Sequence, residues 1–181
     1  MIHRIYVEKK KEYATEASAR LADFREFLGI RGLTDVRLLN RYDYGLLQNA
    51  LDAQLALRCR EEVFSDPLLD IVTESLPADA DRMFATALLP GQFDQRADSA
   101  QACIRLLQSA TIPDGSACLE QSTQVDGACT QDAGGVPFVR CATVWLLYGS
   151  VFDEEFERIK RYVINSVESK EISIQEPPSL P

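Results

Sequence analysis

The sequence predicts a mixed fold of strands and helices built as two similar halves, and three observations support this prediction. Apolar residues recur with period two in some segments and at helical spacing in others, so strands and helices alternate along the chain. The order strand, helix, strand, helix, strand occurs in residues 1–76 and again in residues 77–174. The chain has 181 residues, 46% of them hydrophobic, which suits one compact domain or two closely packed small halves.

The first half begins with a strand around Ile5 and Val7, whose neighbours are polar. A helix follows, with Thr15 as its expected N-cap, Gly29 as its left-handed terminating residue, and an apolar stripe formed by Ala17, Leu21, Phe24 and Leu28. Residues 36–39 are predicted as a strand and residues 69–72 as another. Between them a weaker helix is expected over residues 48–64, before Pro67, with a stripe of Leu51, Leu55, Cys59 and Val63.

The second half repeats this order. Residues 83–89 are predicted as a strand that ends at Pro90, and the next helix carries a stripe of Ala100, Cys103, Ile104 and Leu107. Residues 144–148 are apolar at every position, which is typical of a central strand covered on both faces. Asp153 is the expected N-cap of the last helix, and residues 171–174 form the last predicted strand. The stripe of that helix comprises Phe152, Phe156, Ile159 and Val163.

The two halves match in register, which indicates a duplication. The stripe containing Phe24 maps onto the stripe containing Cys103 with an offset of 79, and Cys59 maps onto Ile159 with an offset of 100. The offset grows by 21, so the second half should contain an insertion of about that length. Residues 109–137 fit this insertion because they hold four glycines, no aromatic residue and no basic residue, and we expect a flexible surface segment there. Residues 77–81 are the expected seam between the halves.

Charge and hydropathy exclude some classes of protein. With 19 basic against 28 acidic side chains the net charge is −9, which argues against nucleic acid as the main partner. No segment approaches the ~20 consecutive apolar residues that span a bilayer. The first residues lack the apolar core and cleavage site of a signal peptide, so a cytoplasmic location and no membrane partner are expected.

Few residues suggest catalysis. The chain lacks the phosphate-binding, dinucleotide-binding, nucleophile-elbow and zinc-protease motifs, and its only histidine is His3. The five cysteines include no CxxC pair and are interpreted as ordinary thiols, with a bridge between Cys118 and Cys129 as the alternative. We interpret the lysines at 9–11 as a solvated strand end rather than a phosphate site. The sequence thus predicts no catalytic, cofactor-binding or metal-binding residue in this chain.

One polar segment lies between a predicted strand and a predicted helix, where α/β folds often bind ligands or partners. Its candidate contact residues, facing either a substrate or another domain, are Gln92, Asp94, Gln95, Arg96 and Asp98. Arg96 could bind a carboxylate or phosphate through two hydrogen bonds. The alternative is structural: one aspartate caps the helix and Arg96 pairs with an aspartate.

This segment also carries a family resemblance. The string 89–100, LPGQFDQRADSA, is similar to the N-terminal domain of the large single-chain phosphoribosylformylglycinamidine synthase. Residues 4–10, 28–30, 36–43 and 159–165 resemble the same domain, so the matches span nearly the whole chain except the insertion. The chain departs from the family at Ser166, where the family has proline, and in the length of the insertion.

The resemblance implies a fold and a role. The family's enzyme amidates formylglycinamide ribonucleotide in purine synthesis, using ATP, magnesium and ammonia drawn from glutamine. Its N-terminal domain is similar to a dimer of the small subunit of the multi-subunit enzyme, so the implied fold is α+β, with helices on antiparallel sheet layers. Strand–helix alternation alone also permits a parallel sheet. The catalytic, ATP and magnesium ligands of the family lie beyond this chain, and residues 175–181 would begin a linker.

Three hypotheses follow. The chain is a non-catalytic scaffold domain whose partners are the synthase and glutaminase domains of the parent enzyme and which supports ammonia transfer. Alternatively, it is a self-standing binding or dimerisation module comparable to the separate small subunit. The third hypothesis, a small thiol enzyme, requires a cysteine with a lowered pKa.

Overall fold

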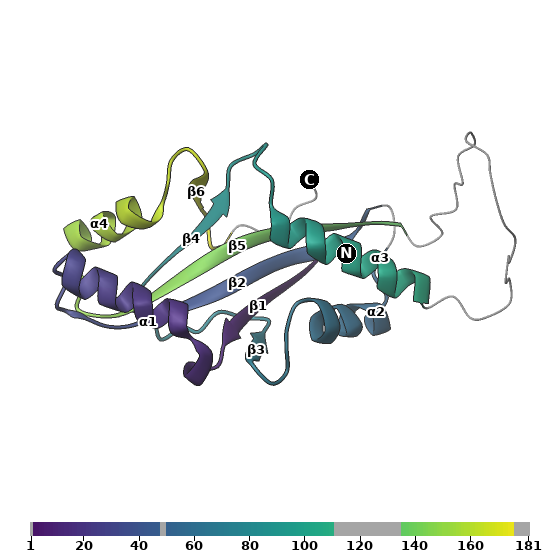
Figure 1. The fold of residues 1–181 in the computed structure, drawn as a ribbon, viewed down its shortest axis with the longest axis horizontal. Coiled ribbons are helices and arrows are strands. Elements are labelled where there is room, and N and C mark those ends of the chain that lie inside the picture. Colours follow the sequence, from purple (N-terminus) through teal and green to yellow (C-terminus); the bar gives the residue numbers. More distant parts are fainter. Residues whose placement is uncertain (1, 48–49, 111–134, 176–181) are drawn as a thin grey trace, which may run out of the picture.

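A computed structural model of the protein describes residues 2–47, 50–110 and 135–175. These residues form six strands and four helices (Figure 1). The strands are β1 (His3–Lys9), β2 (Leu33–Leu47), β3 (Asp70–Thr73), β4 (Arg82–Leu88), β5 (Val136–Gly149) and β6 (Ser169–Ile172). The helices are α1 (Thr15–Ala22), α2 (Ala53–Arg58), α3 (Gln95–Ala110) and α4 (Asp153–Val163). A 3-10 turn (Lys11–Tyr13) precedes α1, and α1 and α2 continue as π-helical turns over Asp23–Phe27 and Cys59–Val63.

The six strands form one antiparallel sheet in the order β3-β1-β2-β5-β4-β6. Its centre is a long ladder between β2 and β5, running from Leu33 opposite Gly149 to Leu47 opposite Val136. Strands β1 and β3 extend the sheet on one side, and β4 and β6 extend it on the other. The antiparallel α+β class implied by the resemblance is therefore confirmed, and all the strands lie in one continuous sheet.

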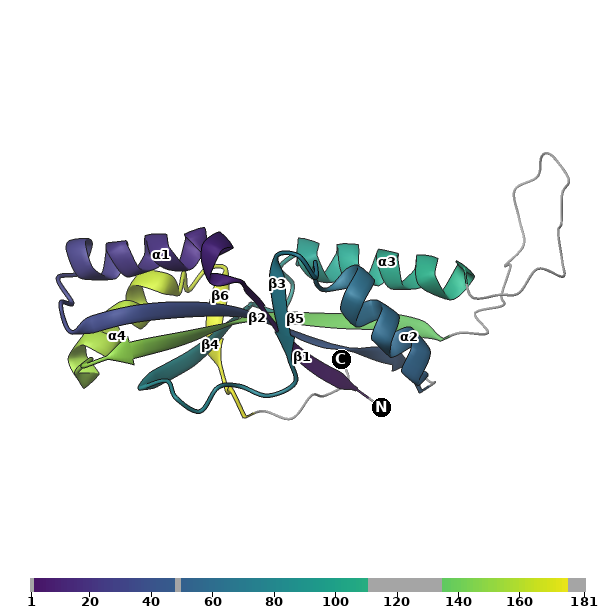
Figure 2. The same cartoon turned by 90° about the horizontal axis from the view of Figure 1, so that it is seen from below.

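All four helices pack on the same face of this sheet. On β5, Cys141, Trp145 and Leu147 point to one face, since side chains alternate along a strand. Trp145 and Leu147 share a core with residues of α1 and α4, whereas Cys141 shares a core with residues of α2 and α3. The helices thus form two pairs, α1 with α4 toward one end of the molecule and α2 with α3 toward the other (Figures 1 and 2).

The opposite face of the sheet has its own smaller core. Val144 and Leu146 of β5 pack there with Tyr6, Leu39 and Ala85. Connecting segments cover this core in place of helices, because Leu76 and Ala80 before β4 and Ile174 after β6 pack against it. The central strand is thus covered on both faces, as its apolar sequence predicts. The expected seam at residues 77–81 lies in this covering segment.

The first and last helices begin within one residue of their predicted N-caps. The helix predicted over residues 48–64 begins only at Ala53, so Leu51 of its predicted stripe precedes the helix. Ala14 precedes α1 and Phe152 precedes α4, so Thr15 and Asp153 are the first helical residues rather than caps. At α4 the first-turn Glu155 carboxylate accepts a hydrogen bond from the Phe152 N–H at 2.9 Å, while Asp153 pairs with Arg82. At α2 a cap does form, since the Asp52 carboxylate accepts from the Leu55 N–H at 2.9 Å.

Two of the predicted helix stripes need correction. Ile104 of α3 is fully buried and Cys103 is exposed, so the buried stripe is Ala97, Ala100 and Ile104. On α4 Phe152 is exposed and Ile159 is the fully buried residue. Both errors arise because several neighbouring residues are apolar, so the sequence leaves the rotation of the helix about its axis uncertain.

Strand lengths also differ from the prediction. β2 and β5 extend far beyond the segments 36–39 and 144–148, and β6 lies two residues before the predicted 171–174. β5 begins at Val136 and α3 continues to Ala110, so both ends of the expected insertion 109–137 belong to regular structure. Residues 111–134 and 176–181 lie outside the described residues, and so do the predictions made for them.

Two glycines have a positive φ angle where a helix or a strand ends. Gly29 has φ of 70° and follows α1 and its π-helical turn, which confirms its predicted role. Gly149 has φ of 111° at the end of β5, where a Cβ atom would lie 2.3 Å from the carbonyl oxygen of Gly32. A side chain is therefore excluded where β5 meets the start of β2.

Candidate functional site

The polar segment predicted as a contact site forms the connection from β4 to α3 and the first turn of α3. The Asp94 carboxylate accepts a hydrogen bond from the Ala97 N–H at 3.1 Å, so it satisfies one of the free amide groups at the start of the helix. The structural interpretation of this aspartate is therefore confirmed.

The hydrogen bonds of Arg96 go to neither Asp94 nor Asp98. Its guanidinium donates to the side-chain carbonyl of Asn40 on β2, and it lies 3.5 Å from the hydroxyl of Thr143 on β5. Asn40 and Thr143 are directly opposite in the central ladder. Arg96 thus connects the start of α3 to the middle of the sheet, although it is itself exposed to solvent.

The other three candidates lie at the surface. Gln92 is exposed, and its side-chain amide donates to the Val167 carbonyl at 3.4 Å. Gln95 and Asp98 are exposed on the first turn of α3. The structure therefore brings Asp94 and Arg96 against the sheet and leaves Gln92, Gln95 and Asp98 facing outward.

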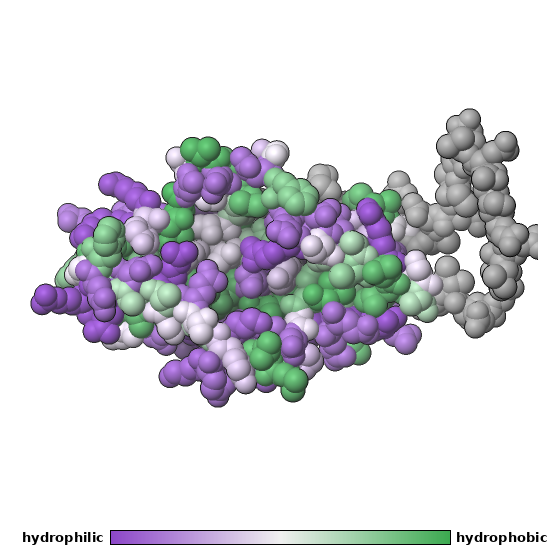
Figure 3. Space-filling view, in the orientation of Figure 1, coloured by the Kyte–Doolittle hydropathy of each residue, from purple (hydrophilic) through white to green (hydrophobic). Residues whose placement is uncertain are grey.

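One exposed apolar side chain lies within this segment and another lies in a neighbouring loop. Phe93 is 73% exposed and Val167 is 72% exposed, and the hydrogen bond of Gln92 to the Val167 carbonyl connects their two loops. Figure 3 shows apolar surface at the projecting turn before β6 and at the corresponding projection beside β3 on the opposite side. Leu68, at 78% exposure, lies in the α2–β3 connection.

Two cavities adjoin the segment. The first, of about 450 Å³, lies between the end of β4 and β5, and Gln92 and Asp94 line it. The second, of about 760 Å³, lies between β1 and the start of α1, and Arg96 lines it together with Asn40 and Thr143. The candidate segment therefore separates two cavities rather than lining one.

The first cavity contains charged residues that sequence reasoning did not find. Asp43 is only 3% exposed, and Arg4 holds its carboxylate through two hydrogen bonds of 2.5 and 2.7 Å. A second guanidinium, from Arg41, lies 3.6 Å from the same carboxylate. The sequence contains a signal for this group, since Arg41 and Asp43 alternate with other residues and so lie on one face of a strand. Opposite charges on one face can neutralise each other when they are buried.

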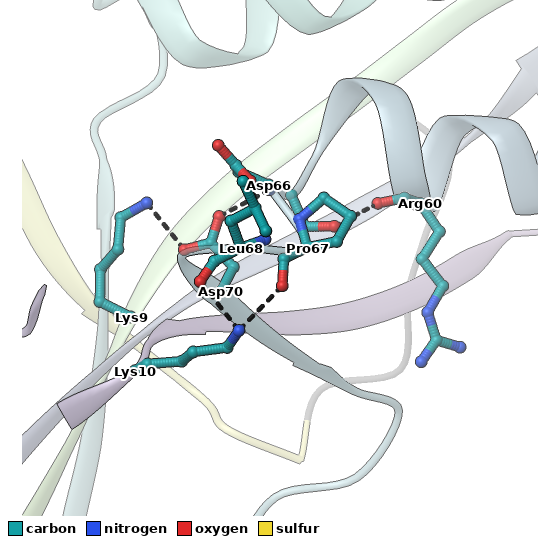
Figure 4. Close-up of polar contacts among 8 residues, drawn as sticks. Lys9, Lys10, Arg60, Asp66, Pro67, Leu68 and Asp70 are labelled. Carbon is teal, nitrogen blue, oxygen red and sulfur yellow. Dashed lines mark hydrogen bonds and ion pairs between the residues drawn. The ribbon is translucent and has the colours of Figure 1, made fainter. Parts of the chain in front are cut away.

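The lysines at 9–11 have a structural role at their first two positions. Lys9 pairs with the Asp70 carboxylate at 2.7 Å, and the Lys10 ammonium donates to the carbonyls of Pro67 and Leu68 at 2.9 and 2.8 Å (Figure 4). These contacts hold the loop before β3 against the end of β1. Lys9 and Lys10 thus have specific partners, although Lys9 remains exposed as predicted for a solvated strand end.

Two of the described thiols, Cys59 and Cys141, are buried and poorly placed for nucleophilic catalysis, whereas Cys103 is exposed on α3. Burial raises the pKa of Cys59 to about 11 and that of Cys141 to about 12, which suppresses the reactive thiolate form. His3 is the first residue of β1 and stacks on Tyr44, with ring centroids 5.5 Å apart. Burial is the main cause that lowers the pKa of His3.

Within the described part of the chain, no cluster of three or more histidine, cysteine, aspartate or glutamate side chains is arranged to hold a metal ion. The helices of this same part are all too short or too polar to cross a membrane. No protein-family model matches the chain, and no curated protein sequence matches it either.

Proposed function

We propose that this chain is the N-terminal, non-catalytic scaffold domain of a phosphoribosylformylglycinamidine synthase. In that role it supports the docking of the synthase and glutaminase domains and the transfer of ammonia between them. ATP and magnesium would bind elsewhere in the parent enzyme. The observation that carries the proposal is the strand order β3-β1-β2-β5-β4-β6, which is symmetrical about the β2–β5 pair. A fused pair of small-subunit-like halves would have such an order.

The proposed duplication has further support in the element boundaries. β1 and β4 each have seven residues, and their bounds differ by 79; β3 and β6 each have four, and their bounds differ by 99. α2 with its π-helical turn spans residues 53–63 and α4 spans residues 153–163, an offset of 100. Fully buried Cys59 and Ile159 occupy matching positions in these helices. Such agreement in length and burial favours two copies of one unit.

The alternative of a self-standing dimerisation module receives less support. In the proposed duplication the two halves pair through β2 and β5, so the edge by which a single half would join its partner is already occupied within this chain. The remaining edges are β3 and β6, each of four residues.

Phe93 in the candidate segment and Val167 in the neighbouring loop before β6 are the proposed docking surface for another domain. Phe93 and Val167 are both largely exposed, and Gln92 joins their loops. Exposed apolar groups that lie together on a protein surface often mark an interaction site. Gln95 and Asp98 would add polar contacts at its rim.

Complementation tests this function. The reading frame is extended past Pro181, the downstream domains are produced without residues 1–181, and glutamine-dependent ATP turnover is measured with and without the separate chain. We expect the 181-residue chain to hydrolyse neither ATP nor glutamine and to restore activity when added. Turnover by this chain alone, or no effect of adding it, would contradict the proposal.

A double variant and a single control variant test the docking surface in the same assay. Phe93→Ser with Val167→Ser should raise the concentration of added chain that restores half of the activity by at least about tenfold. The reason is that buried apolar contacts dominate such interfaces. The control is Leu106→Ser, which removes a side chain with 70% exposure from α3 outside the segment. Equal activity of the two proteins would show that docking occurs elsewhere.

A further inference from the structure

The two halves of the sheet are related by a pseudo-twofold axis that passes through one residue pair. Val7 of β1 pairs with Asn40 of β2, and Thr86 of β4, which is offset from Val7 by 79, pairs with Thr143 of β5. Asn40 and Thr143 therefore occupy equivalent positions in the two halves. They are also direct partners in the ladder between β2 and β5, so the axis runs through them.

Arg96 reaches this axis from one half, on the face of the sheet that carries the helices. Its equivalent in the other half, with the same offset of 79, is Ala17 of α1, which is 7% exposed. The starts of α1 and α3, which carry these two residues, face each other above the centre of the sheet (Figure 2). The smaller side chain leaves space on its side of the axis. The second cavity, of about 760 Å³, is lined by Ala17, Arg96, Asn40 and Thr143 together.

The contacts of Arg96 orient the polar groups at the axis. A guanidinium contains only donors, so the side-chain carbonyl oxygen of Asn40 faces Arg96 and the Asn40 amide N–H groups point elsewhere. Thr143 likewise offers its oxygen to Arg96, which leaves its O–H to donate to another group. The side chains of these three residues thus present N–H and O–H donors to the cavity that they line. Such a group of donors, with a guanidinium among them, suits a carboxylate.

An apolar surface adjoins these donors in the same cavity. The rings of Tyr42 and Phe64 both line it, and their centroids lie 4.7 Å apart. Tyr42 follows Asn40 by two residues on β2, so both side chains lie on the same face of the sheet. Val7 and Leu38 also line the cavity. The cavity therefore places ring and aliphatic surface directly beside the polar groups at the axis.

The acidic residues that the structure places in the lining do not occupy the donors at the axis. Lys9 pairs with Asp70 at 2.7 Å, and an arginine of β2 binds Glu8 through two hydrogen bonds of 2.9 and 2.6 Å. Glu16 and Asp35 are exposed, so water and salt screen their charges. An anionic ligand at the axis therefore meets little repulsion from these four carboxylates.

We propose that the second cavity binds a small organic acid, whose carboxylate is held by Arg96 at the axis and whose apolar ring packs on Tyr42 and Phe64. A guanidinium binds a carboxylate through charge-assisted hydrogen bonds, which are stronger than its bonds to neutral oxygens such as those of Asn40 and Thr143. Aromatic rings bury much apolar area and stack on each other. The volume of about 760 Å³ lies in the range of small-molecule sites. This inference does not depend on the proposed scaffold function.

Titration of the 181-residue chain with phenylacetate, at constant ionic strength and followed by amide NMR, tests the inference. We expect saturable shifts at the amides of Asn40, Arg96 and Thr143. Two partial ligands separate the two requirements, since phenylethanol lacks the charge and acetate lacks the ring. Each should bind at least about tenfold more weakly than phenylacetate. If either binds as tightly, or if phenylacetate produces no saturable shift, the inference is wrong.

Three variants separate a specific site from general charge attraction. Arg96→Ala should weaken phenylacetate binding at least about tenfold, because the charge-assisted hydrogen bonds are lost. Asn40→Asp, which is nearly isosteric, should weaken it to a similar extent while keeping Arg96, because the new carboxylate occupies the guanidinium and repels the ligand. The control, Arg105→Ala, removes one positive charge from an exposed position on the same helix, and we expect it to bind as the unmodified chain does. Equal weakening in the control, or unchanged binding in Arg96→Ala or Asn40→Asp, would overturn the inference.

Discussion

Removing the carboxylate of Asp43 should destabilise the protein strongly. The side chains of Arg4 and Arg41, which share this carboxylate, are only 15% and 8% exposed. The substitution Asp43→Ala leaves both guanidiniums in place without their common counter-charge. Loss of one partner from a buried ion pair costs about 3–5 kcal/mol. For a protein of this size each kcal/mol lowers the melting temperature by about 2–4 °C, so a decrease of roughly 6–20 °C is expected.

The assays are urea unfolding, which gives the free energy of unfolding, and thermal unfolding, which gives the melting temperature, both at pH 7 and followed by circular dichroism. The matched control is Asp153→Ala, because Asp153 also pairs with an arginine but its side chain is 86% exposed. An exposed pair contributes less than about 1 kcal/mol. A third protein, with Asp43→Leu, Arg4→Met and Arg41→Met together, should recover much of the loss because no buried charge remains. The reasoning fails if Asp43→Ala is no more destabilising than the control.

Two further predictions concern the candidate segment and the histidine. Arg96→Ala should lower the melting temperature by no more than about 4 °C in calorimetry, because its bonds to Asn40 and Thr143 are exposed and worth at most about 1 kcal/mol; a much larger decrease would make Arg96 essential to the centre of the sheet. The pKa of His3 is lowered in the folded state, so its contribution to stability is present above its ordinary pKa near 6.5 and is lost as the pH falls toward the lowered value. Unfolding between pH 7.5 and 5 should therefore show a weaker pH dependence in His3→Phe, which keeps a ring against Tyr44, and an unchanged dependence would disprove this.

Local patterns in the sequence predict most elements of the fold. Period-two alternation finds β1, and the helical spacing of Leu51, Leu55 and Cys59 finds the buried face of α2. The same patterns underestimate β2, because its second half carries Arg41 and Asp43 on the face away from the helices. Buried charges that neutralise each other break the expected alternation of apolar and polar residues.

The candidate site is predictable only in part, for a different reason. The cap formed by Asp94 depends on residues three positions away, so its residue type and position in the segment suffice to predict it. The partners of Arg96 lie on β2 and β5, which are separated from it by tens of residues and meet only through strand pairing. A single sequence does not specify which strands pair. The cavities beside the segment depend on that same pairing.

The ladder between β2 and β5 makes the two halves dependent on each other for folding. Its paired residues come from different halves of the sequence, residues 33–47 and residues 136–149. The helices of both halves pack against these two strands. Opening one half would expose the backbone amides of the other half's central strand. Hydrogen exchange in β2 and β5 should therefore require opening of the whole sheet, and a destabilising change in either half should accelerate exchange in both strands.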